Sequence, residues 1–234
     1  MLEDLVFKIF GYDESEIRRV LSENNLSAIL VEVKCLDAKL VVRCDEFDRE
    51  RISMRVYALF PGCVYRDSDG TLAETVLERL RFYNLTLSVA ESLTGGMIAS
   101  DLVDIPGCSE SFLEGIVAYS NQAKISRLGV SATTLQNFGA VSEQVARQMA
   151  SGLIRPGVNY AVSTTGIAGP GGGSPEKPVG LVYIGVADEI NCIATECRFE
   201  GSRDEIRRLS ANTALYLLWK RLIKPIDFNS MVIE

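Results

Sequence analysis

The stretch YAVSTTGIAGPGGG at Tyr160–Gly173 decides how this chain is interpreted. Its first residues, Tyr160–Ser163, are typical of an apolar strand, and five glycines then fall within the eight residues Gly166–Gly173. Each glycine would weaken a helix or strand interior by about 0.5–1 kcal/mol relative to alanine, so we expect the strand to end in a loop. Backbone amides in such a loop can point at a bound phosphate or at a developing oxyanion. A plain surface loop is the alternative.

Helical and strand patterns alternate on both sides of this loop. Thr71–Glu74 resembles a capping box that opens a helix, and a further helix is expected from Ser202 through Leu222. The expected strands are Leu85–Ala90, Phe112–Tyr119, Tyr160–Thr164, Val179–Ala187 and Cys192–Phe199. This alternation predicts an α/β fold over residues 71–225, a three-layer α/β/α sandwich with helices on both faces of the sheet.

The first 70 residues have a pattern of their own. A helix over Asp13–Glu23, two strands and a helix over Glu46–Phe60 predict a small α+β module, with Phe47 on the buried side of the second helix. Asp67–Gly70 is the expected linker to the larger domain. Residues 226–234 are expected to form a C-terminal tail.

The composition of the chain limits the partners and the cell compartment that we expect for it. The 234 residues carry a formal net charge of −7, which argues against nucleic acid as the main partner. Six cysteines without a C-x-x-C pair indicate free thiols. The acidic start, MLEDLVFKIF at Met1–Phe10, is unlike a signal peptide, and no apolar run reaches the ~20 residues of a membrane span. We therefore expect a cytoplasmic protein with no membrane association.

The chain contains no histidine, and this limits its catalytic chemistry. Serine–histidine and cysteine–histidine mechanisms are excluded within these residues, and scattered cysteines alone make a metal site unexpected. A serine nucleophile would need another base. A lysine whose pKa is lowered by burial can serve, and Lys124, five residues after Tyr119, is the candidate. Ser92, in a turn that leads into a helix, and Ser109, in a loop before a strand, are the candidate nucleophiles.

Four segments together resemble one protein family. They are AESLTGG at Ala90–Gly96, YSNQAK at Tyr119–Lys124, GAVS at Gly139–Ser142 and TTGIAGPGGGSPEKPVG at Thr164–Gly180. They are similar to the C-terminal domain of the competence/damage-inducible CinA family, a domain that also occurs alone as the nicotinamide mononucleotide deamidase PncC. The resemblance covers residues 71–223. The first 70 residues resemble the KH-like middle domain of CinA proteins, without the molybdopterin-binding-like domain that precedes it in them.

The resemblance implies an amidohydrolase. It would convert nicotinamide mononucleotide to nicotinate mononucleotide and ammonia in pyridine nucleotide recycling, by a serine–lysine mechanism without metal or cofactor. Ser109 is the first choice of nucleophile and Ser92 the second, with Lys124 as the base and Tyr119 completing the polar group. The implied substrate-binding residues are Thr94, Gly95, Thr165, Gly166, Gly169, Gly171 and Gly172. The substrate phosphate needs a site of its own, for which the candidates are amides at a helix N-terminus or the side chains of Arg203 and Arg207. The family suggests a homodimer.

Two other functions remain open at this point. The glycine loop could hold a nucleotide without turnover, as a competence-related scaffold, or the acidic surface could bind another protein. The N-terminal module has no G-x-x-G loop with basic flanks, so we do not expect it to bind RNA.

Overall fold

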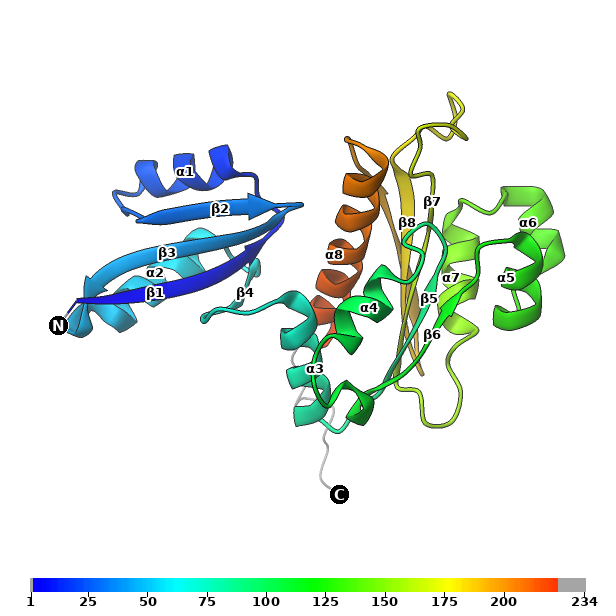
Figure 1. Ribbon diagram of the computed structural model, residues 1–234, viewed down its shortest axis with the longest axis horizontal. Coiled ribbons are helices and arrows are strands. Elements are labelled where there is room, and N and C mark those ends of the chain that lie inside the picture. The colour runs from blue at the N-terminus through cyan, green and yellow to red at the C-terminus, as the bar shows by residue number, and fades with distance from the viewer. Residues whose placement is uncertain (1, 223–234) are drawn as a thin grey trace, which may run out of the picture.

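The computed structural model describes residues 2–222 and contains two sheets, each with its own hydrophobic core (Figure 1). The expected tail at 226–234 lies outside the described residues. The first sheet belongs to an N-terminal module and the second to the larger C-terminal domain. The mixture of helices and strands confirms the α/β fold class.

The N-terminal module contains two strands that the sequence interpretation missed. Its elements are β1 (Leu2–Phe10), α1 (Glu14–Glu23), β2 (Leu30–Lys34), β3 (Asp37–Asp45), α2 (Arg49–Leu59) and β4 (Val64–Arg66). The strands form an antiparallel sheet in the order β2-β3-β1-β4. Instead of the expected helix–strand–strand–helix unit, this β-α-β-β-α-β order is the ferredoxin-like arrangement.

A capping box in the sequence explains where α1 begins. Asp13 caps α1: its side chain accepts the amide hydrogen of Glu16 at 2.8 Å, and the Glu16 carboxylate accepts the amide hydrogen of Asp13.

The expectation that Phe47 is buried is wrong. It lies in a short 3-10 turn, Glu46–Asp48, ahead of α2, and 94% of its surface is exposed. Because Phe47 precedes the helix, it does not share the buried face of α2, whereas Ile52 and Val56 are buried there as expected.

The C-terminal domain is built on a five-stranded sheet. Its elements are α3 (Leu72–Phe82), β5 (Leu87–Glu91), α4 (Met97–Val103), β6 (Phe112–Val117), α5 (Asn121–Leu128), α6 (Ala132–Phe138), α7 (Glu143–Ser151), β7 (Tyr160–Gly166), β8 (Leu181–Asp188), β9 (Cys192–Arg198) and α8 (Arg203–Leu222). The strand order is β6-β5-β7-β8-β9. The first three strands are parallel, whereas β8 and β9 are antiparallel to their neighbours.

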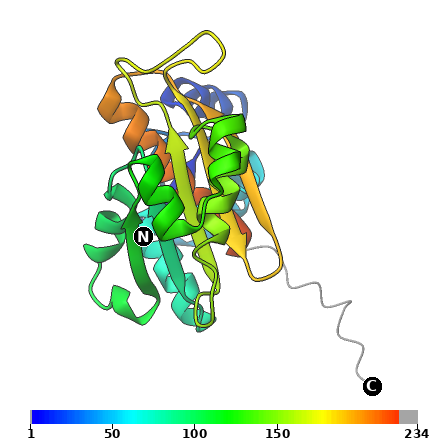
Figure 2. The ribbon, with the colours of Figure 1, turned by 90° about the vertical axis from the view of Figure 1, so that its right-hand side faces the viewer.

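Helices cover both faces of this sheet, as expected for a three-layer sandwich. Alternate residues of β5 show the division: Leu87 and Val89 belong to the core with α3, α4 and α8, whereas Ala90 belongs to the core with α5, α6 and α7. Figure 1 shows the first helix layer between the sheet and the N-terminal module, and Figure 2 shows the second layer in front of the sheet. The capping box at Thr71 is also present.

Aromatic residues join the two modules along α8. The ring of Phe10 stacks on Tyr216 with centroids 4.4 Å apart, and Tyr216 stacks on Trp219 at 5.6 Å. The Tyr216 hydroxyl donates a hydrogen bond to the Gly62 carbonyl at 2.9 Å. The same helix therefore packs against both the sheet of the large domain and the N-terminal module.

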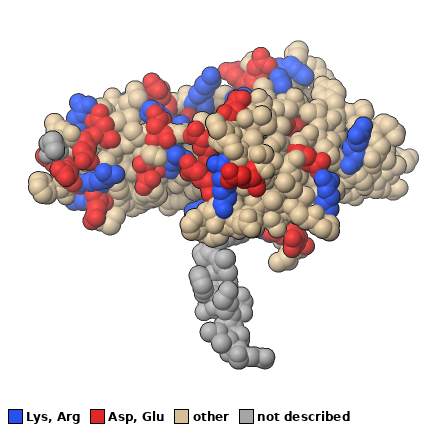
Figure 3. Space-filling model, turned by 60° about the horizontal axis from the view of Figure 1, so that its bottom comes forward, with Lys and Arg blue, Asp and Glu red and all other residues tan. Residues whose placement is uncertain are grey.

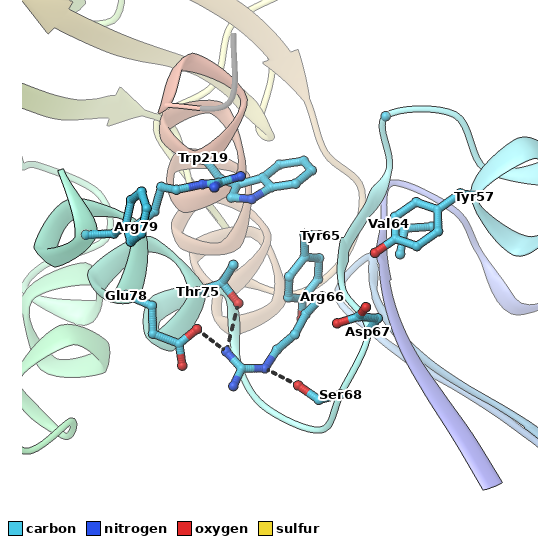
Figure 4. Close-up of a pocket in the computed structure, with 12 residues that line it drawn as sticks. Tyr57, Val64, Tyr65, Arg66, Asp67, Ser68, Thr75, Glu78, Arg79 and Trp219 are labelled. Carbon is cyan, nitrogen blue, oxygen red and sulfur yellow. Dashed lines mark hydrogen bonds and ion pairs between the residues drawn. The ribbon is translucent and has the colours of Figure 1, made fainter. Parts of the chain in front are cut away.

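A cavity of about 630 Å³ lies beside this contact (Figure 4). Figure 4 shows the Arg66 guanidinium reaching toward α3, where it bonds to Glu78 at 2.8 Å and to Thr75 at 3.4 Å, while its Nε bonds to Ser68 at 2.9 Å. These bonds tie the linker between the modules to the first helix of the large domain.

Charges are mixed on the molecular surface. Figure 3 shows acidic and basic side chains interspersed on the face that it presents, in keeping with a formal net charge of −7. Within residues 2–222, no helix is long and apolar enough to cross a membrane.

Candidate active site

The shared direction of the parallel strands β5 and β7 brings two loops to one edge of the sheet. Glu91 and Thr164 are paired in register, so the residues after the end of each strand meet there. A cavity of about 270 Å³ opens between these loops. It is lined by Ser92, Leu93, Tyr119, Lys124, Ala140, Val141, Thr165, Gly166, Ile167, Ala168, Gly169, Gly171, Gly172 and Arg203. Figure 1 shows the yellow glycine loop at this edge, near the first turn of α8.

Ser92 and Lys124 meet in this cavity. The Lys124 Nζ lies 2.9 Å from the Ser92 Oγ, 2.8 Å from the Ala118 carbonyl oxygen and 3.4 Å from the Tyr119 carbonyl oxygen. Lys124 has 1% of its surface exposed and Ser92 has 8%. Burial lowers the pKa of Lys124, because the charged ammonium loses its hydration.

The three oxygen neighbours of Lys124 fit either protonation state: an ammonium donates to all three, and a neutral amine can instead accept from the Ser92 hydroxyl. A protonated lysine has three N–H donors and no acceptor, whereas the neutral amine has two N–H donors and one lone pair. The carbonyls of Ala118 and Tyr119 can accept the two N–H bonds, and the lone pair is then left for the hydroxyl proton of Ser92. This arrangement can remove the proton from the serine.

A buried carboxylate shapes the turn that carries Ser92. Glu91, with 1% of its surface exposed, accepts amide hydrogens from Gly96 at 2.8 Å, Ile98 at 3.2 Å and Ala99 at 2.9 Å. These amides begin α4 and would otherwise lack acceptors. The turn needs its glycine at position 96, which has φ +100°.

Arg207 holds the same turn from α8. Its guanidinium donates to the Leu93 carbonyl at 3.0 Å and to the Thr94 carbonyl at 2.9 Å. Thr94 is fully buried and its hydroxyl lies 2.8 Å from that of Thr164. Among residues 2–222, the backbone amides of Leu93 and Thr94 have no hydrogen-bond partner, and Leu93 also lines the cavity, where its amide can donate to a ligand oxygen.

The glycine loop is fixed at its base by backbone and side-chain bonds. The Ile167 amide donates a hydrogen bond to the Leu181 carbonyl, and the Gly180 amide donates one to the Ile167 carbonyl. These two bonds continue the pairing of β7 with β8 into the base of the loop. Arg203 donates to the Gly169 carbonyl at 2.7 Å. A Cβ on Gly166 would lie 2.8 Å from the Leu181 carbonyl oxygen, so the close backbone approach requires glycine there.

Most of the site residues expected from the sequence line this cavity. They are Ser92, Lys124, Tyr119, Thr165, Gly166, Gly169, Gly171 and Gly172. Thr94 and Gly95 lie in the Ser92 turn but do not line the cavity. Tyr119 lies at its rim with 66% of its surface exposed, and it contributes its backbone carbonyl to Lys124.

The structure does not bring Ser109 to Lys124. Ser109 is exposed in a 3-10 turn, Cys108–Glu110, that precedes β6. Because β5 and β6 are parallel and Leu87 pairs with Phe112, a residue before β6 lies at the opposite edge of the sheet from a residue after β5. The placement therefore reverses the order of the two candidate nucleophiles and favours Ser92.

Several residues around the site were not singled out from the sequence, among them Ala140, Val141 and Glu91. Ala140 and Val141 form one wall of the cavity, and Glu91 holds the turn of the neighbouring wall. Their positions inside motifs could have identified them: Ala140 and Val141 belong to the GAVS motif, and Glu91 belongs to the AESLTGG motif. Within the described chain, no group of three or more Cys, Asp or Glu residues is placed to hold a metal ion.

Comparison with known proteins identifies the family. Residues 69–222 match the CinA C-terminal domain family. This chain belongs to that family. The CinA C-terminal domain thus accounts for the whole five-stranded sheet and for every residue that lines the cavity.

Solved structures and sequence relatives agree with this assignment. A competence/damage inducible protein from Agrobacterium tumefaciens is 45% identical with a TM-score of 0.63, and the match covers 65% of this chain and 94% of that one. A CinA superfamily protein from Escherichia coli is 33% identical with a TM-score of 0.61, over 63% of this chain and 87% of that one.

The sequence relatives extend beyond this chain. A relative from Caldicellulosiruptor saccharolyticus is 40% identical over 230 residues, which cover 93% of this chain and 56% of the relative. A CinA-like protein from Fusobacterium nucleatum is 45% identical over 178 residues, which cover 75% of this chain and 44% of that protein. The chain thus spans about half the length of these CinA relatives.

Proposed function

We propose that this chain hydrolyses the carboxamide of nicotinamide mononucleotide, with Ser92 as the nucleophile and Lys124 as its base. The observation that carries the proposal is the buried contact of 2.9 Å between Lys124 Nζ and Ser92 Oγ, at the floor of a cavity walled by a glycine loop. Nucleophilic catalysis by serine requires a base within hydrogen-bond reach of the hydroxyl, and Lys124 meets that requirement in a chain without histidine.

The reaction proceeds in two steps. The lone pair of Lys124 takes the Ser92 hydroxyl proton while Oγ attacks the carboxamide carbon, and the carbonyl π electrons move to oxygen. The tetrahedral intermediate collapses, the C–N bond breaks, and the lysine proton passes to the leaving nitrogen to release ammonia. Lys124 then takes a proton from a water molecule whose oxygen attacks the ester carbon. The bond from that carbon to Ser92 Oγ breaks, Oγ receives the proton back from Lys124, and the nicotinate product is released.

The free amides beside Ser92 support stabilisation of the oxyanion. Leu93 lines the cavity, and the amides of Leu93 and Thr94 have no partner among residues 2–222. Donors of this kind lower the barrier most when they are fixed before the reaction begins. Glu91 and Arg207 fix this turn through its amides and carbonyls. Removal of one such donor typically costs about 3–4 kcal/mol of barrier stabilisation.

The two candidate arginines have different roles in this proposal. The Arg207 guanidinium is engaged by two backbone carbonyls and by Asp204 at 3.5 Å, so it holds the serine turn. Arg203 lines the cavity, is exposed to solvent and, within the described part of the chain, bonds only to the Gly169 carbonyl. Its remaining N–H groups can therefore receive the substrate phosphate, for which guanidinium is well suited.

The decisive test is incubation of the purified chain with nicotinamide mononucleotide. We expect ammonia and nicotinate mononucleotide in equal amounts, measured by a coupled ammonia assay and by mass spectrometry, and a hydroxamate when hydroxylamine replaces water. The Lys124→Met variant should release neither product. Binding of the mononucleotide without ammonia release would reject the enzyme and support the alternative of a nucleotide-binding scaffold.

A further inference from the structure

A lysine outside the cavity links two of its walls. Lys177 lies in the segment after the glycine run, and its ammonium donates to the Phe138 carbonyl at 2.5 Å and to the Val141 carbonyl at 2.6 Å. Val141 lines one side of the cavity, and Gly171 and Gly172 line another. Lys177 itself does not line the cavity. Its side chain hydrogen-bonds to the wall residues through the carbonyls of Phe138 and Val141.

The backbone of Lys177 is held in a tight turn. The Ser174 amide donates to the Lys177 carbonyl at 2.8 Å, and the Lys177 amide donates to the Ser174 hydroxyl at 3.1 Å. The Ser174 hydroxyl in turn donates to the Glu176 carboxylate at 2.9 Å. The Lys177 backbone is therefore fixed in this turn, while its ammonium bonds to the opposite wall. Loss of the ammonium would remove that bond between the glycine loop and the wall.

The acceptors of Lys177 suit a cation. Phe138 is the last residue of α6, where carbonyl groups have no helical partner and the helix dipole favours positive charge. A charge-assisted bond to such a carbonyl is stronger than a bond between neutral groups. The wall that carries these acceptors is also anchored to the sheet, because the Thr165 hydroxyl donates to the Ala140 carbonyl at 2.8 Å.

No other side chain in residues 2–222 hydrogen-bonds between the 170–178 loop and the 138–142 wall. The remaining anchors of the loop, at Gly169 and Gly180, hold only its two ends. Loss of the lysine would thus free the middle of the loop while its ends stay attached.

We propose that Lys177 is a positioning residue that keeps the glycine loop closed against the 138–142 wall, and so sets the affinity of the site for its ligand. The effect on affinity rests on the proposed amidase function, whereas the effect on the loop does not. Because Lys177 is not among the residues that line the cavity, the rate of bond cleavage in the bound complex should be nearly independent of it.

The test compares three variants of the full chain. Lys177→Met removes the charge and the donors, Lys177→Arg keeps both, and Lys177→Gln keeps a neutral donor in case the first variant folds poorly. Lys220→Met is the matched control, because the Lys220 ammonium also bonds to a backbone carbonyl, that of Gly62 at 3.1 Å, but at the contact between the modules.

Hydrogen–deuterium exchange and steady-state kinetics are the two measurements. For Lys177→Met we expect amide exchange at least about fivefold faster in peptides that cover 138–142 and 168–178, unchanged exchange in the β5 peptide, and a KM about tenfold higher with kcat within twofold. Lys177→Gln should fall between Lys177→Met and the wild type. Lys177→Arg and Lys220→Met should match the wild type in these peptides and in KM.

Each outcome decides one part of the proposal. Unchanged exchange in both Lys177→Met and Lys177→Gln would overturn the role in loop closure, whether or not the protein is an amidase. Faster exchange with a lower kcat and an unchanged KM would overturn the role in affinity. If the wild type releases no ammonia, the proposed function fails, while the exchange data still decide whether Lys177 holds the loop.

Discussion

Removal of Ser92 and Lys124, singly and together, tests whether the two side chains act as one unit. Their atoms lie 2.9 Å apart and both are buried, so each variant, Ser92→Ala or Lys124→Met, eliminates the same proton transfer. A general base contributes about 10²–10⁴ to the rate, which is about 3–5.5 kcal/mol at about 1.4 kcal/mol per decade. We therefore expect each variant to lower kcat/KM about 10³-fold, the middle of this range.

The double variant distinguishes a shared role from two independent ones. Independent contributions would multiply to about 10⁶, whereas members of one catalytic unit are strongly non-additive. We expect the double variant to be no slower than the slower single variant, a coupling of about 4 kcal/mol at about 1.4 kcal/mol per decade. Initial rates of ammonia release over a range of substrate concentrations provide kcat/KM for all four proteins.

Ser109→Ala is the control for this cycle, because it removes the other candidate serine from the opposite edge of the sheet. It should retain activity within about twofold of the wild type. The reasoning is refuted if Ser92→Ala keeps more than a tenth of the wild-type kcat/KM, or if Ser109→Ala loses as much as Lys124→Met.

The same geometry supports three further predictions. Burial lowers the pKa of Lys124, and the neutral amine is the active form, so kcat/KM should rise with pH with a midpoint below the ordinary lysine value. The unfolded state binds that proton more tightly than the folded state, so the stability of the wild type relative to Lys124→Met should also rise with pH up to the ordinary lysine value in urea unfolding; a difference that stays flat throughout would contradict a lowered pKa. Glu91→Gln should lower the free energy of unfolding by about 2–3 kcal/mol, since a charged acceptor of three amides is lost, and an unchanged urea midpoint would exclude this role. Arg203→Gln should raise KM for nicotinamide mononucleotide about tenfold and leave the rate on nicotinamide riboside, which has no phosphate, unchanged; equal effects on both would place the phosphate elsewhere.

Much of the fold was predictable because its signals are local. Capping residues such as Thr71 and Asp13 mark helix starts through bonds within three residues, and the glycine run marks the end of a buried strand. The missed strand β1 also carried a signal, the alternation of Leu5, Phe7 and Ile9. Its ladder partner is β3, and pairing over such a separation in the sequence leaves no local trace. The start of α2, and with it the exposure of Phe47, depended on one 3-10 turn.

The sequence by itself determined the chemistry available to this protein: no histidine, a candidate lysine base with two candidate serines, and a glycine loop after a strand. It could not determine which serine meets Lys124. Ser109 is the nearer of the two along the chain, yet it precedes β6, whereas Ser92 comes directly after β5. Parallel pairing of these strands gathers the residues after their carboxyl ends at one edge of the sheet, and the full height of the sheet separates them from the residues before the strands begin. Only that tertiary arrangement brought Ser92, and not Ser109, to the buried Lys124.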